Sequence, residues 1–379
     1  MATRSSEKKT VLVTGSEGFI GKNLIAQLEL SDAFIIKGLN RSNSSDVKEL
    51  CRDVDFVFHL AGENRPNNPE EFKRVNVDFT MLLLKTLEDI GRPIPLLFTS
   101  STQVGLDNEY GKTKKLAEDA IQEYGTATHS PTYIYRLPNV FGKWAKPNYN
   151  SVVATFCYNI THSLPLRIDN PDTTITLVHI DDVVSAFINH LSEKTSDSSS
   201  TPFRVSPTCD ITIGELSQKI EEFWTSRTSK IVPDLSSKFS KALYGTLTSY
   251  YEMDQLSVKP EIFSDDRGWL FELIKSNTGG QIFVSSTNPG YTRGDHWHHT
   301  KVEKFTVIKG TGTLLFRHVN SDKITSFTLS DKEIEIFDVP VGYIHAIRND
   351  SKEKMLLLIW ASEMLDKEKP DTYYERVEK

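Results

Sequence analysis

The chain has 379 residues, which predicts two compact domains rather than one. Hydrophobic residues make up 38% of the sequence and charged residues 25%, an ordinary composition for a soluble globular protein. The formal net charge of −7 argues against a broad nucleic-acid-binding surface, because such surfaces need clustered Lys and Arg, so the expected partners are small molecules.

The cysteines and the apolar segments indicate the compartment. Cys51, Cys157 and Cys209 are widely spaced and form no CxxC pair, which is typical of a reducing environment and not of a disulfide scaffold. The amino terminus is short and polar, without the apolar core of a signal peptide, and no segment has the apolar length that spans a bilayer. We therefore expect a cytoplasmic protein with no membrane or nucleic-acid partner.

Apolar strand-like runs alternate with amphipathic segments from residue 10 to about 190. This alternation is typical of parallel strands joined by crossover helices, and it predicts an α/β domain with a doubly wound sheet. The polar run SEKTSDSSST at 192–201 is expected to be a surface loop of this domain. The strand-like runs are VLVTG (11–15), FIIKGLN (34–40), VDFVFHLAG (54–62), IPLLFTSST (94–102) and YIYRLPNVFG (133–142).

Beyond residue 260 the chain contains short β-rich runs separated by turns with Gly, Asn, Asp or Ser. Many short strands with turn signals between them predict a sandwich or barrel. We place the boundary near residues 245–260, which gives domains 1–250 and 251–379. The runs are QIFVSST (281–287), KFTVIKG (304–310), GTLLFRHV (312–319), KITSFTL (323–329), EIEIFDVP (333–340) and KMLLLIWA (354–361).

A glycine-rich turn follows the first strand-like run. In TGSEGFIG, Gly15, Gly18 and Gly21 form a GxxGxxG pattern before an amphipathic segment, so a pyrophosphate can approach the backbone at a helix amino terminus. The second run ends in Leu39, Asn40 and Arg41 without the carboxylate typical of NAD enzymes, and an arginine there suits the 2′-phosphate of NADPH. The alternative is that Arg41 is a solvated loop residue.

A YxxxK pattern, Tyr110 and Lys114, begins another helical segment. Residues four apart share a helix face, and a nearby ammonium lowers the pKa of a phenol, which suits Tyr110 for proton transfer to a carbonyl. Just upstream, Ser101 ends a buried strand and offers a hydroxyl to the same substrate oxygen. Taken alone, a Tyr-Lys pair is usually just two surface residues without a catalytic role.

Residues 10 to about 245 resemble the extended short-chain dehydrogenases/reductases. The motifs are TGSEGFIG, HLAG (59–62), Asn76 in RVNVDFT, the Ser101-Tyr110-Lys114 triad and YRLPNVFG (135–142). The resemblance implies a Rossmann-like domain acting on nucleotide sugars, with Tyr110 as catalytic acid, Lys114 on the nicotinamide ribose and Ser101 orienting the substrate. The implied cofactor-binding residues are Gly15, Gly18, Phe19, Ile20, Gly21, Asn40, Arg41, Leu60, Ala61, Gly62, Tyr110 and Lys114.

Three histidines lie within GDHWHH (294–299). On an extended strand His296 and His298 project to the same face, and strand pairing can bring Glu303 and His345 beside them as ligands of zinc or another divalent transition metal. His299 points the other way. The alternative is that these are ordinary core and surface residues, and a bound metal has either a catalytic or a structural role.

The spacing of these ligands resembles the paired motifs of the cupin superfamily, which implies a small β-barrel that holds the metal inside. One departure is Ile334, where a glycine is expected six residues before Pro340. DDRGWLFE (265–272) and YTRGDHWHH also resemble segments of cupin-type epimerases acting on 4-keto-6-deoxy nucleotide sugars. Arg267 and Arg293 would then bind a diphosphate; the alternative is a pair of surface arginines.

The domain order resembles two-domain enzymes of capsular polysaccharide biosynthesis, including the stretches 141–160 and PDTYYERVE near the carboxyl end. This implies a homodimer in which the cupin domain epimerises C3 of UDP-2-acetamido-2,6-dideoxy-L-hexos-4-ulose. The first domain would then reduce C4 with NADPH, on the way to N-acetyl-L-fucosamine. Asn139 and Asn150 are the implied sugar-nucleotide contacts.

Three alternatives stay open. The first is a 4-keto sugar reductase without C3 epimerisation, in the L-rhamnosamine/L-quinovosamine branch. The second is a 4-epimerase or dehydratase, although STQVG (101–105) lacks the acidic residues that dehydratases of this family carry. The third makes the cupin domain a noncatalytic module that binds sugar nucleotide or holds a dimer together.

Overall fold

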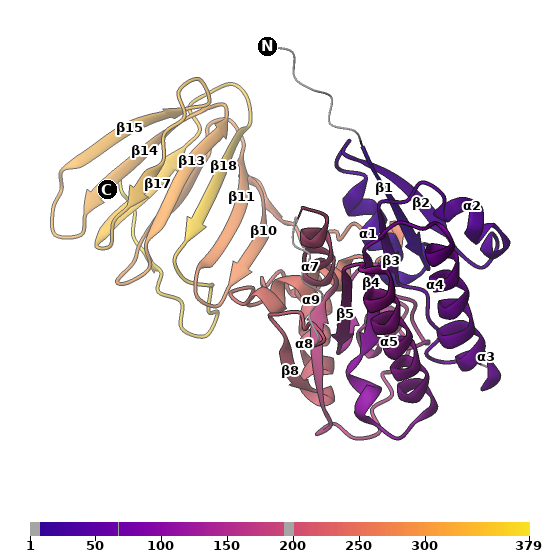
Figure 1. Cartoon of the computed structure of the whole chain (residues 1–379). Coiled ribbons are helices and arrows are strands. Elements are labelled where there is room, and N and C mark those ends of the chain that lie inside the picture. The colour runs from indigo at the N-terminus through magenta and orange to yellow at the C-terminus, as the bar shows by residue number, and fades with distance from the viewer. Residues whose placement is uncertain (1–7, 67, 193–200) are drawn as a thin grey trace, which may run out of the picture. The chain divides into compact units, whose positions relative to one another are not determined.

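The computed structural model describes residues 8–66, 68–192 and 201–379, so most of the predicted loop at 192–201 lies outside the described residues. Two compact units are present (Figure 1). The first comprises the described residues up to Glu221 together with Leu235–Glu252, and the second comprises Glu222–Asp234 and Met253–Lys379.

The predicted boundary between residues 250 and 251 placed Glu222–Asp234 in the first domain. In the structure this segment belongs to the second unit. Its end adds to the second unit through backbone pairing: Lys275 donates to the carbonyl oxygen of Lys230 at 2.8 Å, and Val232 donates to that of Lys275 at 2.7 Å. The hydropathy pattern alone does not reveal this assignment, because the segment begins as a continuation of helix α8 (Ile213–Ser229) from the first unit and pairs with the second unit only at its end.

The first unit is built on a five-stranded parallel sheet in the order β2-β1-β3-β4-β5. Each strand overlaps a predicted apolar run, although β1 and β5 begin one or two residues earlier, and the α/β doubly wound class is confirmed. The strands are β1 (Lys9–Thr14), β2 (Phe34–Leu39), β3 (Phe56–His59), β4 (Leu96–Ser101) and β5 (Thr132–Leu137). The main helices are α1 (Phe19–Leu28), α4 (Phe79–Asp89), α5 (Glu109–Thr128) and α7 (Ile180–Ser192), with the short α2 (Val47–Cys51) and α3 (Glu70–Lys73).

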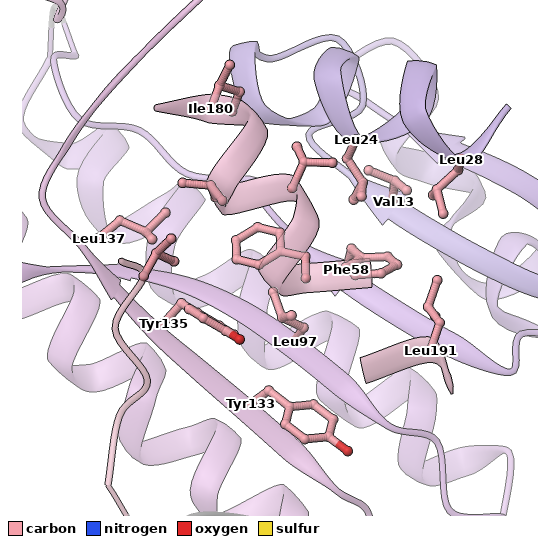
Figure 2. Packing of buried hydrophobic residues seen from close by; sticks show 14 of the residues in the cluster. Val13, Leu24, Leu28, Phe58, Leu97, Tyr133, Tyr135, Leu137, Ile180 and Leu191 are labelled. Atoms are coloured by element: carbon pink, nitrogen blue, oxygen red, sulfur yellow. The ribbon is translucent and has the colours of Figure 1, made fainter. Parts of the chain in front are cut away.

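Both faces of this sheet are buried, as a doubly wound fold requires. Successive strand residues point to opposite faces, so Val11 and Val13 pack under α1 and α7, while Leu12 faces α4 and α5. Figure 2 shows the first of these clusters, in which side chains of α1 and α7 meet those of the strands. The sheet thereby holds the carboxyl ends of its strands, where the polar motifs lie, in fixed positions.

A second, three-stranded sheet completes the first unit, in the order β6-β7-β8. Its strands β6 (Asn139–Phe141) and β7 (Thr174–His179) are parallel, and β8 (Cys209–Thr212) is antiparallel to β7. The remaining helices are α6 (Val152–Thr161), α8 (Ile213–Ser229), which continues into the second unit, and α9 (Lys238–Thr248).

Apart from the end of α8 and a short 3-10 turn at Met253–Gln255, the regular structure of the second unit is β, which confirms the predicted class. Two antiparallel sheets, of six and five strands, share a core that includes Phe305, Leu314, Ile347 and Leu357. The strand in the predicted run 333–340 is shorter than expected: it covers only β16 (Phe337–Val339), Glu333 forms an isolated bridge with Ser330, and Ile334 is exposed. The strands are β9 (Phe263–Asp265), β10 (Gly268–Ser276), β11 (Gly280–Thr287), β12 (Thr292–Trp297), β13 (Glu303–Lys309), β14 (Thr311–His318), β15 (Ile324–Ser330), β16, β17 (Tyr343–Arg348), β18 (Met355–Ala361) and β19 (Tyr373–Tyr374).

Two expectations about the whole chain can be compared with the described residues. None of their helices is both long and apolar enough to cross a membrane. Cys51, Cys157 and Cys209 are all free thiols, as the spacing predicted.

Candidate functional site

The turn between β1 and α1 forms the floor of a pocket in the first unit. Gly15 has a φ of +68°, and a Cβ added to Gly21 would lie 2.2 Å from the carbonyl oxygen of Gly15, so both positions require glycine. Gly18 is the N-cap of α1, where no described side chain supplies a capping hydrogen bond. The first N–H groups of α1 are thus available to an anionic group, as in dinucleotide-binding folds.

Six of the twelve predicted cofactor residues line the pocket, and the other six do not: Phe19, Ile20, Gly21, Leu60, Tyr110 and Lys114. Phe19, Ile20 and Leu60 pack against the hydrophobic core, because their side chains point toward the sheet. The six lining residues are Gly15, Gly18, Asn40, Arg41, Ala61 and Gly62.

Glu63, which the sequence did not single out, lies next to this pocket. Its side chain is only 7% exposed, and its Oε2 accepts a 2.6 Å hydrogen bond from Arg41, whose side chain is 75% exposed. Its Oε1 accepts from the Tyr149 hydroxyl and from the backbone N–H groups of Asn64 and Arg65. Burial alone would raise the pKa of Glu63, but these hydrogen bonds hold it below the ordinary value.

Asn76 fixes the loop that carries Glu63. The Asn76 amide donates to the carbonyl oxygen of Glu63 at 2.9 Å and to the Thr113 hydroxyl at 3.2 Å, and its Oδ1 accepts from the Glu63 N–H at 2.8 Å. Asn76 lies in a π-helical turn, Arg74–Asp78, a local irregularity that recurs at functional sites. The predicted HLAG and RVNVDFT motifs are therefore joined to α5 through one buried side chain.

Ser101, Tyr110 and Lys114 come together where β4 ends and α5 begins. Tyr110 makes a side-chain hydrogen bond with Ser101. Lys114 is 3% exposed, its Nζ lies 2.9 Å from the position of a Cβ added to Gly62, and it donates to the carbonyl oxygen of Thr99 at 2.9 Å. Lys114 is thus adjacent to the pocket through Gly62, and Tyr110 lies one helical turn before it on α5.

The predicted effect of Lys114 on Tyr110 is wrong in this structure. Burial raises the pKa of Tyr110, and the hydrogen bond with Ser101 only partly offsets this rise. The ammonium instead bonds to Thr99 and lies 4.6 Å from the centre of the Phe98 ring. A raised pKa keeps the Tyr110 phenol protonated at neutral pH, which is the form that an acid catalyst needs.

The two predicted sugar-nucleotide contacts are both exposed. Asn139 begins β6, and its amide donates to the carbonyl oxygen of Thr176 at 3.2 Å. Asn150 lies between Tyr149, which bonds to Glu63, and Ser151, the N-cap of α6. The loop that carries Asn150 is therefore attached directly to the rim of the cofactor pocket.

In the second unit the four predicted metal ligands converge. His296 is on β12, His298 follows that strand, Glu303 begins β13 and His345 lies on β17. One ligand atom from each of them lies within 4.8 Å of all the others. A bulge between Gly294 and His296, with Asp295 at a φ of +57°, shifts the register of β12 and pairs His296 with His345.

The hydrogen bonds of two imidazoles fit a cation. The Nδ1 atoms of His298 and His345 face the backbone carbonyls of Asp371 and Tyr343, which can only accept, so each Nδ1 carries the proton. In the neutral rings both Nε2 atoms then present lone pairs, at 3.4 and 3.1 Å, to the same Glu303 oxygen. The buried Nε2 of His298 makes no hydrogen bond to any described residue, and a shared divalent cation would resolve this arrangement.

The protonation state of His296 also favours a bound cation. Burial lowers the pKa of His296 to about 4, so at neutral pH this ring is uncharged. Its neighbour His299 lies outside the cluster, with its ring against Trp297 and Tyr373.

Arg267 and Arg293, the predicted diphosphate ligands, meet at one carboxylate. Arg267 donates to Asp265 Oδ2 at 3.0 and 2.5 Å, and Arg293 donates to Oδ1 at 3.4 Å. The Nε of Arg293 is buried without a hydrogen-bond partner among the described residues. Two guanidinium groups and one carboxylate leave an excess positive charge, which suits an anionic ligand.

Two family models match the chain. Residues 11–205 match the NAD dependent epimerase/dehydratase family, and residues 263–373 match the polysaccharide biosynthesis C-terminal domain. A UDP-2-acetamido-2,6-beta-L-arabino-hexul-4-ose reductase from Pseudomonas aeruginosa is 43% identical over 364 residues, covering 96% of this chain and 97% of that relative.

Comparison with solved structures supports the same family. The capsular polysaccharide assembling protein CapF from Staphylococcus aureus aligns with a TM-score of 0.90 and 37% identity, over 97% of this chain and 100% of its own. UDP-glucuronic acid 4-epimerase from Bacillus cereus, solved with UDP-glucuronic acid and NAD, shares only the fold, with a TM-score of 0.55 and 17% identity over 64% of this chain and 98% of its own. The protein therefore belongs to the NAD dependent epimerase/dehydratase family, in the group that carries a polysaccharide biosynthesis C-terminal domain and includes CapF.

Proposed function

We propose that the chain is an NADPH-dependent reductase of the C4 ketone of UDP-2-acetamido-2,6-dideoxy-L-hexos-4-ulose, and that its second unit epimerises C3 of the same sugar. The observation that supports the reductase is the position of Lys114, whose Nζ lies against Gly62 in the lining of the glycine-floored pocket, with Tyr110 one helical turn before it. The relative from Pseudomonas aeruginosa, named as a reductase of such a UDP-sugar, supports the substrate class. The product lies on a route to UDP-N-acetyl-L-fucosamine for a surface polysaccharide.

In the reductive step the residues of the first unit bind the ketone and supply its proton. The nicotinamide, when bound, supplies the hydride to C4. Ser101 and Tyr110 donate hydrogen bonds to the C4 oxygen, and Tyr110 transfers its proton to that oxygen as negative charge develops there. Lys114 holds the nicotinamide ribose when the cofactor is bound, and Asn139 and Asn150 contact the sugar nucleotide.

NADPH is preferred because of the chemistry where β2 ends. Arg41 lines the pocket with a largely exposed guanidinium, and a guanidinium matches the oxygens of a 2′-phosphate. The carboxylate that would accept hydrogen bonds from the ribose of NAD is replaced by Asn40. Saturation curves with NADPH and NADH test this preference.

In the second unit, His296, His298, Glu303 and His345 hold a divalent cation, zinc on the basis of its nitrogen and oxygen donors. The cation, when bound, polarises the C4 carbonyl and so acidifies the hydrogen at C3. Arg267 and Arg293 bind the diphosphate. The unit is assigned to the cupin superfamily, and the enzyme is a cytoplasmic homodimer.

A structural role for the metal is the second candidate. Four protein ligands complete a tetrahedral zinc shell, and structural zinc sites are closed in this way, whereas catalytic sites keep an open position. In that case the second unit is a noncatalytic module and the chain a reductase alone. Incubation of the 4-keto sugar with enzyme in D₂O, without NADPH, separates the two: deuterium at C3 indicates epimerisation, and its absence indicates the structural role.

The reductase itself is tested by following the absorbance of NADPH after addition of the 4-keto UDP-sugar. We expect consumption of the cofactor by the wild type and a loss of roughly 10²–10⁴-fold in kcat for Tyr110→Phe. Tyr291→Phe, on the second unit, is the matched control and should retain the wild-type rate. An unchanged absorbance with the wild type, or full activity in Tyr110→Phe, would contradict the proposed reductase mechanism.

A further inference from the structure

The last residues of the chain run along the strand that carries His296. In the short strand β19, Tyr374 pairs with His296 and Tyr373 with Trp297. Beyond it, the N–H of Glu375 donates to the carbonyl oxygen of Asp295 at 2.9 Å. The segment from Asp371 to Val377 therefore covers the metal-ligand strand from one edge.

A buried arginine fastens the end of this segment. Arg317, on β14, is 2% exposed, and its guanidinium donates to the carbonyl oxygens of Val377 at 3.0 Å and Arg376 at 2.8 Å. The same guanidinium forms an ion pair with Glu375 at 2.6 Å. A buried arginine whose donors are used by backbone carbonyls holds the segment in one place, because releasing it would leave the buried guanidinium with only the Ser321 carbonyl as a partner.

At the other end of the segment, Asp371 organises the turn that follows His298. Its carboxylate accepts three successive backbone hydrogen bonds, from His299 at 2.9 Å, Thr300 at 2.8 Å and Lys301 at 2.9 Å. It also accepts from the Thr300 hydroxyl at 3.0 Å. One carboxylate thus fixes the backbone of the whole turn between the ligands His298 and Glu303.

The backbone carbonyl of Asp371 acts on the ligand itself. It accepts the hydrogen bond from Nδ1 of His298, which fixes the tautomer of the ring. The opposite nitrogen, Nε2, then points its lone pair at Glu303, and this atom is buried without a hydrogen-bond partner among the described residues. A carbonyl on the outer nitrogen of a metal-binding histidine sets its orientation and raises its basicity.

We propose that Asp371 is a positioning residue of the metal site, so that the carboxyl-terminal segment is part of that site and not a passive tail. The proposal rests on the divalent cation of the proposed function. Asp371 does not touch the cation; it holds His298 through its carbonyl and holds the turn through its carboxylate. Substitution of Asp371 therefore weakens metal binding without removing a ligand.

The test measures zinc affinity in the full-length protein, by competition with a chromogenic chelator, for the wild type and Asp371→Ala. Asp366→Ala is the matched control, because Asp366 also caps a turn of this region, with hydrogen bonds from Glu368 at 2.8 Å and Lys369 at 3.3 Å. We expect Asp371→Ala to lose roughly 10–100-fold in zinc affinity and Asp366→Ala to match the wild type. Asp371→Asn, which keeps one carboxylate-like oxygen, should fall between them.

Two further readouts separate positioning from simple support of the fold. The absorption spectrum of the Co²⁺-substituted protein reports ligand geometry, and it should change in Asp371→Ala but not in Asp366→Ala. Melting in excess chelator should show similar midpoints for the two variants, with zinc raising the midpoint less in Asp371→Ala. Wild-type affinity and an unchanged Co²⁺ spectrum in Asp371→Ala would overturn the proposal alone, whereas a wild type that binds no metal overturns the metal site as well.

Discussion

The ammonium of Lys114 donates a hydrogen bond of 2.9 Å to the carbonyl oxygen of Thr99, two residues before Ser101 on the same strand. Burial lowers the pKa of Lys114 from 10.5 to about 8. As the pH rises through about 8 the ammonium is therefore lost, although free lysine stays charged well above this value.

The first prediction concerns the pH dependence of the reduction. Because the Lys114 ammonium must be charged to hold the nicotinamide ribose in the proposed mechanism, kcat should fall as the pH rises through about 8. Initial rates across this range, with NADPH and the 4-keto sugar saturating, provide the measurement. Lys114→Met should be slow at every pH and lack this basic limb, while Lys115→Met, at an exposed position of the same helix, should keep it. A wild-type rate that stays flat far into the alkaline range would contradict the role of Lys114.

The β1–α1 turn gives the second prediction. In Gly21→Ala the new Cβ would lie 2.2 Å from the Gly15 carbonyl oxygen, so the backbone of the turn must move. NADPH binding, measured by fluorescence titration, should weaken by at least about tenfold, which corresponds to 1.4 kcal/mol. In Gly105→Ala no described atom lies within 4 Å of the new Cβ, and binding should match the wild type. Equal affinities for the two variants would show that the turn does not hold the cofactor.

The motifs with short spacing could be predicted from the sequence. Gly15, Gly18 and Gly21 form one turn, and Tyr110 and Lys114 share one helix turn. The four candidate metal ligands follow strand alternation, with His345 added through strand pairing. Glu63 and Asp371 were missed because their roles depend on contacts across the fold: Tyr149 lies 86 residues from Glu63, and Asp371 lies 73 residues from His298. The direction of the Tyr110 pKa shift was missed for a related reason, since it follows from burial and not from the YxxxK spacing.

Glu63 gives the third prediction, on stability. Glu63→Gln removes the charge that accepts hydrogen bonds from Arg41, Tyr149 and two backbone N–H groups, and it should lower the free energy of unfolding by about 1–3 kcal/mol at neutral pH. The folded-state pKa lies below the ordinary 4.5, so this stability is present above pH 4.5 and is lost as the pH falls through the lower folded value.

Urea unfolding at neutral pH and below pH 4.5 measures this effect. The difference between wild type and Glu63→Gln should shrink at the acidic pH. The control is Glu49→Gln, since Glu49 forms an exposed ion pair with Arg52 that contributes little stability. A difference that persists or grows in acid would mean that the ionised form of Glu63 is not the stabilising one.

Metal removal gives the fourth prediction. Because Glu303 is the one carboxylate among the four clustered groups, Glu303→Gln should lose stoichiometric zinc, while Glu335→Gln, at an exposed position, should keep it. Chelation of the wild type should lower its thermal midpoint, since a ligand that binds only the folded state stabilises it. Elemental analysis and calorimetry provide the two readouts. A full complement of zinc in Glu303→Gln would show that Glu303 is not a zinc ligand.

The central claim is that the first unit delivers a hydride to C4 of a UDP-linked 4-keto sugar with Tyr110 as the acid. The most direct test is NMR of the product formed from UDP-2-acetamido-2,6-dideoxy-L-hexos-4-ulose and NADPH deuterated at the transferred position. Deuterium at C4 of the product with the wild type, and a loss of roughly 10²–10⁴-fold in its rate of appearance with Tyr110→Phe, are the predicted results. Deuterium that stays in the cofactor while the ketone is unchanged, or undiminished transfer by Tyr110→Phe, would contradict the claim.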